Sequence, residues 1–279
     1  MLKYLKLLRP QHWIKNLLLF AAPFFGGRLF NEETVLMAFP AFVAFSLCAS
    51  AAYIFNDIKD IENDKLHSKK MKRPVASGII SRRDASAFAF LLIVPSFILS
   101  YKIAPAFFSY ILLYISIQLL YSLYLKHIAL LDIFCIASGF VIRVLAGGAA
   151  FNVAVSQWLL LTMFMISLVL AAGKRLGEFS LLNEKAEEHR KSLSYYSKGA
   201  LNDIFLISAS ASLITYTLYT IEQFQQLVYT VPIVTFGLFR YILLTRQGKG
   251  DPVEAVTQDK WLASTVLLWL LLVGLIRYN

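Results

Sequence analysis

Long apolar runs separated by short polar segments make up nearly the whole chain. An α-helix of about 20 mostly apolar residues crosses a hydrocarbon core about 30 Å thick. Measured against that length, the pattern predicts nine membrane-spanning helices, with approximate ranges 13–30, 35–55, 85–101, 106–125, 131–151, 157–176, 200–221, 227–245 and 261–277. We therefore expect an all-α, polytopic membrane protein in which residues 1–279 form a single transmembrane domain.

The composition agrees with a membrane protein and excludes an ordinary soluble domain. Apolar residues make up 58% of the 279 positions and charged residues only 16%, and the mean hydropathy is +0.63. The net charge of +10 is also typical of proteins that bind nucleic acid. Here, however, the cations lie in short loops between apolar runs, as expected beside anionic lipid headgroups. We therefore expect the bilayer, and no nucleic acid, as the partner of these charges.

The cations are distributed unevenly between the two sides of the predicted bundle. If the N-terminus is cytoplasmic, 22 Lys and Arg residues fall on that side and three on the other. Because loops rich in Lys and Arg stay in the cytoplasm, this bias predicts the orientation. The two longest polar loops, residues 57–83 and 174–198, then both face the cytoplasm.

A row of acidic residues begins where the second apolar run ends. Asp57, Asp60 and Asp64 follow Asn56 within nine positions. If the helix continues, Asn56, Asp60 and Asp64 lie on one of its faces, four residues apart. Such a row of like charges needs a counter-ion, and Mg²⁺ is a hard cation that prefers oxygen ligands. The pattern therefore predicts a magnesium site formed by these four side chains.

Basic residues follow the acidic row at once, and they include Lys70 and Arg73. Mg²⁺ commonly shares its coordination shell with substrate phosphates, and Lys and Arg bind phosphate oxygens strongly. The combination indicates a phosphorylated ligand held by metal and cations together. The alternative is a solvated cytoplasmic loop whose acids and bases pair with one another.

Arg143 lies inside the fifth predicted span. A cation at that depth is costly unless it faces the bundle interior and has a partner, and we expect Asp132 or a bound phosphate in that role. The alternative is that Arg143 has a purely structural partner, or that its side chain extends until the guanidinium group reaches the membrane–water interface. The nearby Gly147 and Gly148 are expected to allow close helix packing, since no strand-to-helix phosphate loop surrounds them.

Polar residues at three other places are candidates for binding. Lys174, Arg175 and Glu178 lie at the end of the sixth span, where basic residues also satisfy the topology rule, and Tyr196 lies further along the loop that follows. Lys15 stands beside an interfacial tryptophan near the N-terminus.

The last polar loop contains Asp251, Glu254 and Asp259. Grouped acids of this kind are consistent with a second acidic site. Asp followed by Pro, with Glu nearby, is equally typical of a capped helix start.

Several of these stretches have the spacing of motifs known from one family. N-D-x-x-D-x-x-x-D occurs at residues 56–64, followed by H-x-x-K-x-x-R-P-x-A-x-G at 67–78. Further motifs are R-P-x-H-W-x-K-N at 9–16, G-K-R-x-x-E at 173–178, R-K-S-L at 190–193 and R-Y at 240–241. Together they resemble the UbiA superfamily of intramembrane prenyltransferases, and most closely its decaprenyl-phosphate phosphoribosyltransferase branch. A second D-x-x-x-D, usual in aromatic prenyltransferases, is replaced by G-K-R-L-G-E, which favours this branch.

The resemblance implies a Mg²⁺-dependent transferase that moves 5-phosphoribose from phosphoribosyl diphosphate to a polyprenyl phosphate, at the cytoplasmic face of the bacterial inner membrane. Asp57, Asp60 and Asp64 would be the catalytic residues, holding Mg²⁺ with Asn56 against the leaving diphosphate. The implied substrate contacts are Lys15, Asn56, Lys70, Arg73, Arg143, Lys174, Arg175, Glu178 and Tyr196. The acceptor phosphate is itself the nucleophile, so no activated Ser, Cys or His is required.

Two alternatives stay open. One is a UbiA-type prenyltransferase that uses an isoprenyl diphosphate donor and an aromatic acceptor. The other is a lipid or ion transporter, which is expected to place ionisable groups near the middle of the membrane, at broken helices in two matching halves. Only Arg143 is clearly embedded in a span and the acids gather at one surface, which favours an enzyme.

Overall fold

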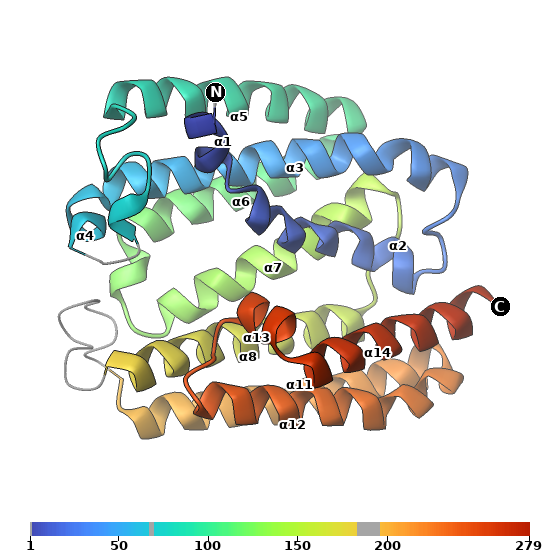
Figure 1. Ribbon diagram of the computed structural model, residues 1–279. Helices are drawn as coiled ribbons and strands as arrows, with labels where there is room; N and C mark the ends of the chain where they lie inside the picture. The colour runs from blue at the N-terminus through green and yellow to red at the C-terminus, as the bar shows by residue number, and fades with distance from the viewer. Residues whose placement is uncertain (1, 67–69, 183–195) are drawn as a thin grey trace. The chain divides into compact units, whose positions relative to one another are not determined.

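The computed structural model describes residues 2–66, 70–182 and 196–279, and these residues form helices joined by short turns, with no strand among them (Figure 1). The helices are α1 Leu2–Leu8, η1 Pro10–Phe20, α2 Ala21–Phe25, α3 Glu32–Lys59, α4 Ile61–Lys65, η2 Lys70–Lys72, α5 Arg82–Ile103, α6 Pro105–Leu123, η3 Leu125–His127, α7 Leu131–Ala150, α8 Gln157–Leu182, α11 Lys198–Gln223, η5 Gln225–Thr230, α12 Val231–Arg246, α13 Pro252–Gln258 and α14 Lys260–Tyr278. Within the described ranges, 8 helical segments are long and apolar enough to cross a membrane. The predicted all-α polytopic architecture is confirmed, and these 8 segments match the last eight predicted ranges.

The first predicted span folds differently from the others. In place of one long α-helix, residues 10–25 form the 3-10 helix η1 followed by the short helix α2. A 3-10 helix of 11 residues is unusually long. A Cβ atom added at Gly147 of α7 would collide with the backbone of Leu19 in η1. The apolar pattern predicted one membrane-spanning helix over residues 13–30, whereas the structure has a 3-10 helix and a short α-helix here, with close backbone contact to α7 at Gly147. The expected packing role of Gly147 is confirmed by this contact.

The chain divides into two compact units. The first contains Met1–Lys126 and Ile142–Ala154, and the second contains His127–Val141 and Val155–Asn279. Helix α7 contributes residues to both.

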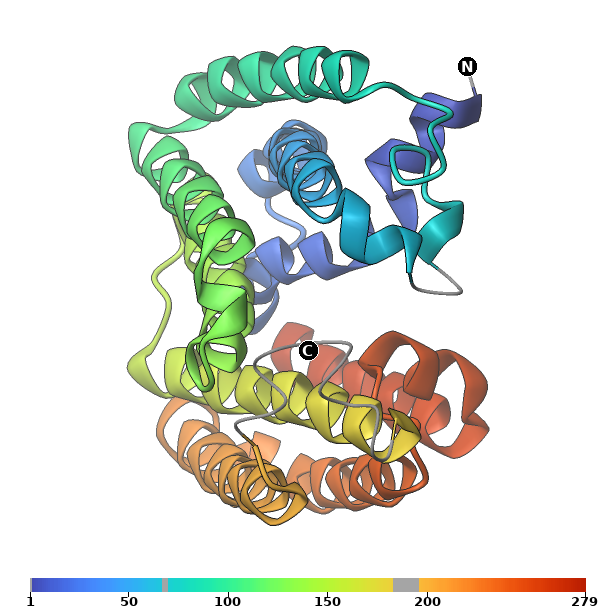
Figure 2. The same ribbon diagram turned by 90° about the vertical axis from the view of Figure 1, so that its left-hand side faces the viewer.

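In the first unit, α3 is the central helix. It packs against α5 and α6 and against the N-terminal segments α1 and η1. Figure 2 shows these four segments around α3. Ile54, Val75, Ile80 and Ala85 belong to a buried cluster that holds the loop after α4 against α3 and α5. The end of α3 is therefore enclosed by apolar contacts on the side where the acidic residues begin.

In the second unit, α8 packs along α11 and also contacts α12 and α13. Val169, Ala172, Leu201 and Phe205 are at or near zero exposure in its core. The turn after α12 lies directly on α8, because a Cβ added at Gly177 would be 2.8 Å from the Cα atom of Gly250. Glycine at these positions lets the turn approach the part of α8 that carries the predicted polar residues.

Candidate functional site

The acidic row lies where α3 ends and α4 begins. Helix α3 ends at Lys59, and Asp60 has φ −96° and ψ 9°, outside the helical region, before α4 starts at Ile61. The helix is therefore interrupted in the middle of the motif, so the condition for one continuous face carrying Asn56, Asp60 and Asp64 is not met. Asp57 and Asp64 are seven positions apart, a spacing that places residues on the same side of a helix.

Asp57 and Asp64 converge on a single cation. The Nη1 atom of Arg73 donates to Oδ1 of Asp57 at 3.1 Å and to Oδ2 of Asp64 at 2.6 Å. The side chains of the two acids are only 2% and 3% exposed. The acids and bases of this stretch do pair, as the alternative expected, but Asp57 and Asp64 are buried and not solvated. Buried carboxylates of this kind must be held by cations.

Asp60 has a different partner, which the sequence reasoning missed. The ammonium group of Lys126, in η3, donates to Oδ1 of Asp60 and is itself buried, with a side-chain exposure of 9%. In the sequence Lys126 is one lysine directly after an apolar run, and that position is equally typical of a topological anchor. Only the fold brings it to a carboxylate 66 positions earlier in the chain.

A second arginine reaches Asp57 from the N-terminal segment. Nη2 of Arg9 donates to the same Oδ1 atom that Arg73 contacts. Arg9 has φ 51° and ψ 57°, a left-handed conformation that costs a non-glycine residue about 1–2 kcal/mol. Such strain persists only where the surroundings hold it, and here it directs the guanidinium group to the acidic row.

The contact between Arg9 and Asp57 is the first of a row that follows one face of α3. The side chains that make this row are polar or aromatic, and on η1 and α3 they recur at helical spacing. The pairs are Arg9 with Asp57, His12 with Tyr53 by a ring contact, Trp13 with Ser50, and Asn16 with Ser46. The motif at residues 9–16 therefore fixes the register of the N-terminal segment against α3.

Arg143 ends this row inside the first unit. Its Nε atom donates to Asn16 Oδ1 at 2.8 Å and its Nη2 atom to the Tyr114 hydroxyl at 3.1 Å, and the guanidinium lies 5.2 Å from the centre of the Phe45 ring. The residue is 4% exposed, so the predicted inward orientation is observed. Asp132, expected as its partner, precedes it by eleven positions on α7, about 16 Å of helix and beyond side-chain reach.

Asp132 instead belongs to a buried cluster in the second unit. Nε of Arg175 donates to Asp132 Oδ2 at 2.8 Å and Nη1 donates to Glu178 at 2.8 Å. The Tyr196 hydroxyl donates to Asp132 Oδ1 at 2.9 Å and accepts from the backbone N–H of Leu130. Burial raises the pKa of Tyr196 to about 12, so the phenol keeps its proton. With Arg175 only 1% exposed, this cluster fastens α7, α8 and the start of α11 together.

Lys174 points to the turn after α12. Its ammonium lies 3.4 Å from Asp251, and its side chain stays 41% exposed. Asp251 also accepts from the N–H groups of Val253 and Glu254 at the start of α13. Burial alone would raise the pKa of Asp251, but Lys174 and these N–H groups lower it overall. Of the two interpretations of the last acidic loop, the capped helix start matches this geometry.

Asp259 supports the same interpretation at the next helix. It accepts from Arg240 Nε at 3.0 Å, from Arg240 Nη2 at 2.6 Å and from the N–H of Leu262 in the first turn of α14. These hydrogen bonds, that of Arg240 first, lower the pKa of Asp259 to about 2. Asp259 therefore keeps its charge in the folded protein at any ordinary pH.

This pKa leads to a prediction about stability. The unfolded pKa of Asp is about 3.9, so the stabilisation by Asp259 is present above that pH and is lost as the pH falls toward 2. Asp259→Asn should lower the melting temperature at pH 7, and the difference from the native sequence should shrink between pH 4 and 2. Melting in detergent checks this, with the exposed Asp203→Asn as control. A difference that does not change with pH would contradict the assignment.

Three further predicted residues lie in α3, η2 and η1. Asn56 is half-buried and directly precedes Asp57, Lys70 is exposed in η2, and Lys15 is half-buried in η1. The histidine of the downstream motif, residue 67, and the R-K-S-L motif at 190–193 lie outside the described residues.

The acidic row fits a hard divalent cation. Its donors are carboxylate oxygens, and Asp57 and Asp64 already converge on one positive charge. Mg²⁺ needs few protein ligands when phosphates and waters complete its shell. In the ranges that the structure covers, no three His, Cys, Asp or Glu residues are grouped as a complete ligand set, because Asp60 turns to Lys126. Asp57 and Asp64 converge and Asp60 lies beside them. These carboxylates fit a metal ion whose remaining ligands are phosphate oxygens.

Comparison with known proteins identifies the family of the chain. The sequence model described as the UbiA prenyltransferase family matches residues 17–271. A decaprenyl-phosphate phosphoribosyltransferase of Mycolicibacterium smegmatis is 35% identical, covering 98% of this chain and 92% of the relative, and one of Corynebacterium glutamicum is 35% identical, covering 98% and 86%. The structure of a UbiA homologue of Archaeoglobus fulgidus bound to GPP and Mg²⁺ has a TM-score of 0.78 at 19% identity, over 99% of this chain and 100% of that chain.

The chain belongs to the UbiA prenyltransferase family. It is an integral membrane protein and an enzyme, a transferase of the prenyltransferase type. The resemblance drawn from the motifs is thereby confirmed, and the transporter alternative loses its support.

Proposed function

We propose that the protein transfers 5-phosphoribose from phosphoribosyl diphosphate to a polyprenyl phosphate at the cytoplasmic face of the membrane. The observation that carries the proposal is the 35% identity, over 98% of the chain, to relatives named for this transfer. Arg9, Arg73 and Lys126, the cations that pair with the acidic row, support the proposal. Two phosphorylated substrates need more positive charge than one.

The reaction needs no nucleophile from the protein. A phosphate oxygen of the lipid forms a bond to the anomeric carbon of ribose, and the bond from that carbon to the diphosphate oxygen breaks with its electron pair. The products are a phosphoribosyl lipid phosphate and inorganic diphosphate. The task of the enzyme is therefore to stabilise the charge that develops on the leaving diphosphate.

Asp57 and Asp64, with Asp60 and Asn56 beside them, would hold Mg²⁺, which when bound supplies Lewis-acid stabilisation of the diphosphate. Arg9, Arg73 and Lys126 lie on these carboxylates and can donate to phosphate oxygens. Lys70 and Lys15 are proposed as further phosphate contacts, on the motifs alone.

In the second unit the proposed roles differ between neighbours. Lys174 stays partly exposed and is the proposed contact for a donor phosphate. Arg175, Glu178 and Tyr196 are engaged in the Asp132 cluster, so we now assign them a positioning role. Arg143 is likewise surrounded by Asn16, Tyr114 and Phe45 and positions η1.

The test uses the purified full chain, Mg²⁺, phosphoribosyl diphosphate labelled in the ribose, and a polyprenyl phosphate. Label extracted into organic solvent, dependent on both substrates and lost with EDTA, is the expected result. The second candidate is prenylation of an aromatic acceptor, favoured by the fold shared with a homologue bound to GPP. Incorporation of labelled isoprenyl diphosphate into an aromatic acceptor, with none from phosphoribosyl diphosphate, would replace the proposal by that alternative.

A further inference from the structure

Every carboxylate of the acidic row is paired with a cation from another part of the chain. Arg9 precedes η1, Arg73 follows η2 and Lys126 lies in η3. Their partners are Asp57 for Arg9, Asp57 and Asp64 for Arg73, and Asp60 for Lys126. Three positive and three negative side chains therefore balance one another at one place in the first unit.

These pairs are built into the fold and are not loose surface contacts. The side chains of Arg9, Lys126 and Arg73 are 14%, 9% and 25% exposed. Arg9 is held in a left-handed backbone conformation, and the row of contacts from η1 to α3 fixes its position. A buried charge of either sign cannot lose its partner without finding another.

The three cations contact one oxygen of each carboxylate, Oδ1 of Asp57, Oδ1 of Asp60 and Oδ2 of Asp64. A metal of charge +2 that coordinates Asp57, Asp60 and Asp64 competes with these cations for the same negative charges and weakens their ion pairs. Bound alone, it leaves them beside an added charge of +2 with nothing to neutralise them. Diphosphate bound alone meets cations already neutralised by carboxylates. Bound together, the metal takes the carboxylates and the diphosphate takes the cations.

We propose that the site works by exchange of ion pairs, so that Arg9, Arg73 and Lys126 pass from the carboxylates to the diphosphate oxygens when metal and diphosphate bind together. This inference rests on the proposed function only in that the donor carries a diphosphate. It predicts a strong positive coupling between the two ligands, which must be the same in both directions. It also assigns binding roles to Arg9 and Lys126 that the motifs did not reveal.

The experiment titrates the purified full-length protein by calorimetry with Mg²⁺, with inorganic diphosphate, and with each in the presence of the other. Saturating diphosphate should lower the apparent dissociation constant of Mg²⁺ by about tenfold or more, and Mg²⁺ should do the same for diphosphate. Affinities that are unchanged by the other ligand, after correction for the Mg²⁺–diphosphate complex in solution, would overturn the proposal.

Two variants give a signature that a merely structural role would not produce. Arg9→Gln and Lys126→Met each remove a competitor of the metal, so the affinity for Mg²⁺ alone should rise, by about threefold. The affinity for diphosphate in the presence of Mg²⁺ should fall about tenfold, because one charge-assisted hydrogen bond is lost. Lys6→Ala removes an exposed cation from α1 and should change neither value.

The outcomes separate the possible explanations. Opposite changes in the two affinities support the exchange, whereas a fall in both, or no change in either, refutes it. If one variant does not fold, the other variant and the coupling in the native protein still decide. The titrations use inorganic diphosphate, so they do not depend on phosphoribose transfer. Failure to transfer phosphoribose would refute the proposed function but not the exchange of ion pairs. Absence of coupling between Mg²⁺ and diphosphate would refute the exchange but not the proposed function.

Discussion

Replacing Asp57 by Asn is expected to reduce transfer by about 10² to 10³, the range found when a main electrostatic contact to a transition state is removed. Asp57 is 2% exposed and its Oδ1 atom accepts from both Arg9 and Arg73. The amide keeps the shape and one acceptor oxygen but loses the charge. It can neither hold a metal as a carboxylate does nor balance two guanidinium groups.

The measurement is the rate of label transfer to the lipid, with melting in detergent to show that the variant is folded. Glu62→Gln is the matched control: it lies in α4 between Asp60 and Asp64, and its side chain is 72% exposed. That variant should retain the native rate. Equal rates for the native enzyme and Asp57→Asn would remove Asp57 from the catalytic site.

Replacing Gly147 by Ala is expected to prevent correct assembly of the first unit. An added Cβ would occupy the backbone of Leu19, and no flexible side chain is available to move aside. Overpacking costs about 1–3 kcal/mol where side chains can adjust, so a collision with backbone should exceed that range. We expect little folded protein after extraction, measured by size-exclusion chromatography and melting.

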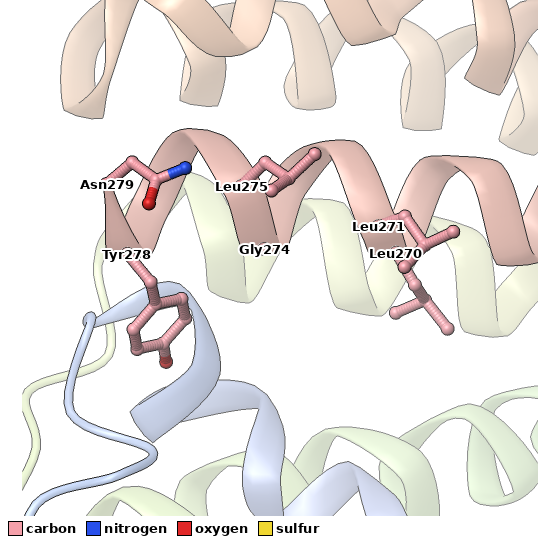
Figure 3. Close-up of a pocket in the computed structure, with 6 residues that line it drawn as sticks. All are labelled: Leu270, Leu271, Gly274, Leu275, Tyr278 and Asn279. Carbon is pink, nitrogen blue, oxygen red and sulfur yellow. The ribbon is translucent and has the colours of Figure 1, made fainter.

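Gly274 in α14 is the matched control. A Cβ there would meet nothing within 4 Å, because this glycine opens onto a shallow apolar groove together with Leu270, Leu271, Leu275 and Tyr278 (Figure 3). Gly274→Ala should be neutral or stabilise by about 0.5–1 kcal/mol through helix propensity. If both variants fold equally well, the contact between α7 and η1 is not the one described.

The apolar pattern was sufficient for most of the fold but not for the N-terminal segment. Each of the last eight predicted ranges coincides with an apolar helical segment, because the thickness of the bilayer sets both the length and the composition of a span. The exception, residues 13–30, was apolar enough, but it forms a 3-10 helix and a short α-helix, and its backbone lies against Gly147 of α7. Contacts between distant parts of the chain leave no periodic signal.

The candidate site also contains residues that the sequence predicted and residues that only the fold revealed. Asp57, Asp64 and Arg73 were found from sequence, since their spacing forms a dense local motif, and the structure brings them together. Arg9 and Lys126 were missed as partners of the acids because each resembles an ordinary interfacial cation. Asp132 was one of two candidate partners for Arg143, but it pairs with Arg175, which lies 43 positions further along, and only the fold places these two residues together.

The buried position of Arg175 limits how the specificity of this enzyme can be redesigned. An acidic pair, as aromatic prenyltransferases have in this stretch, cannot be introduced at residue 175 by one substitution. The new carboxylate would stand beside the buried Asp132 and the half-buried Glu178 in place of the guanidinium group that pairs with both, and the three acids would repel one another. An acidic residue at position 175 therefore requires the charges of Asp132 and Glu178 to change with it.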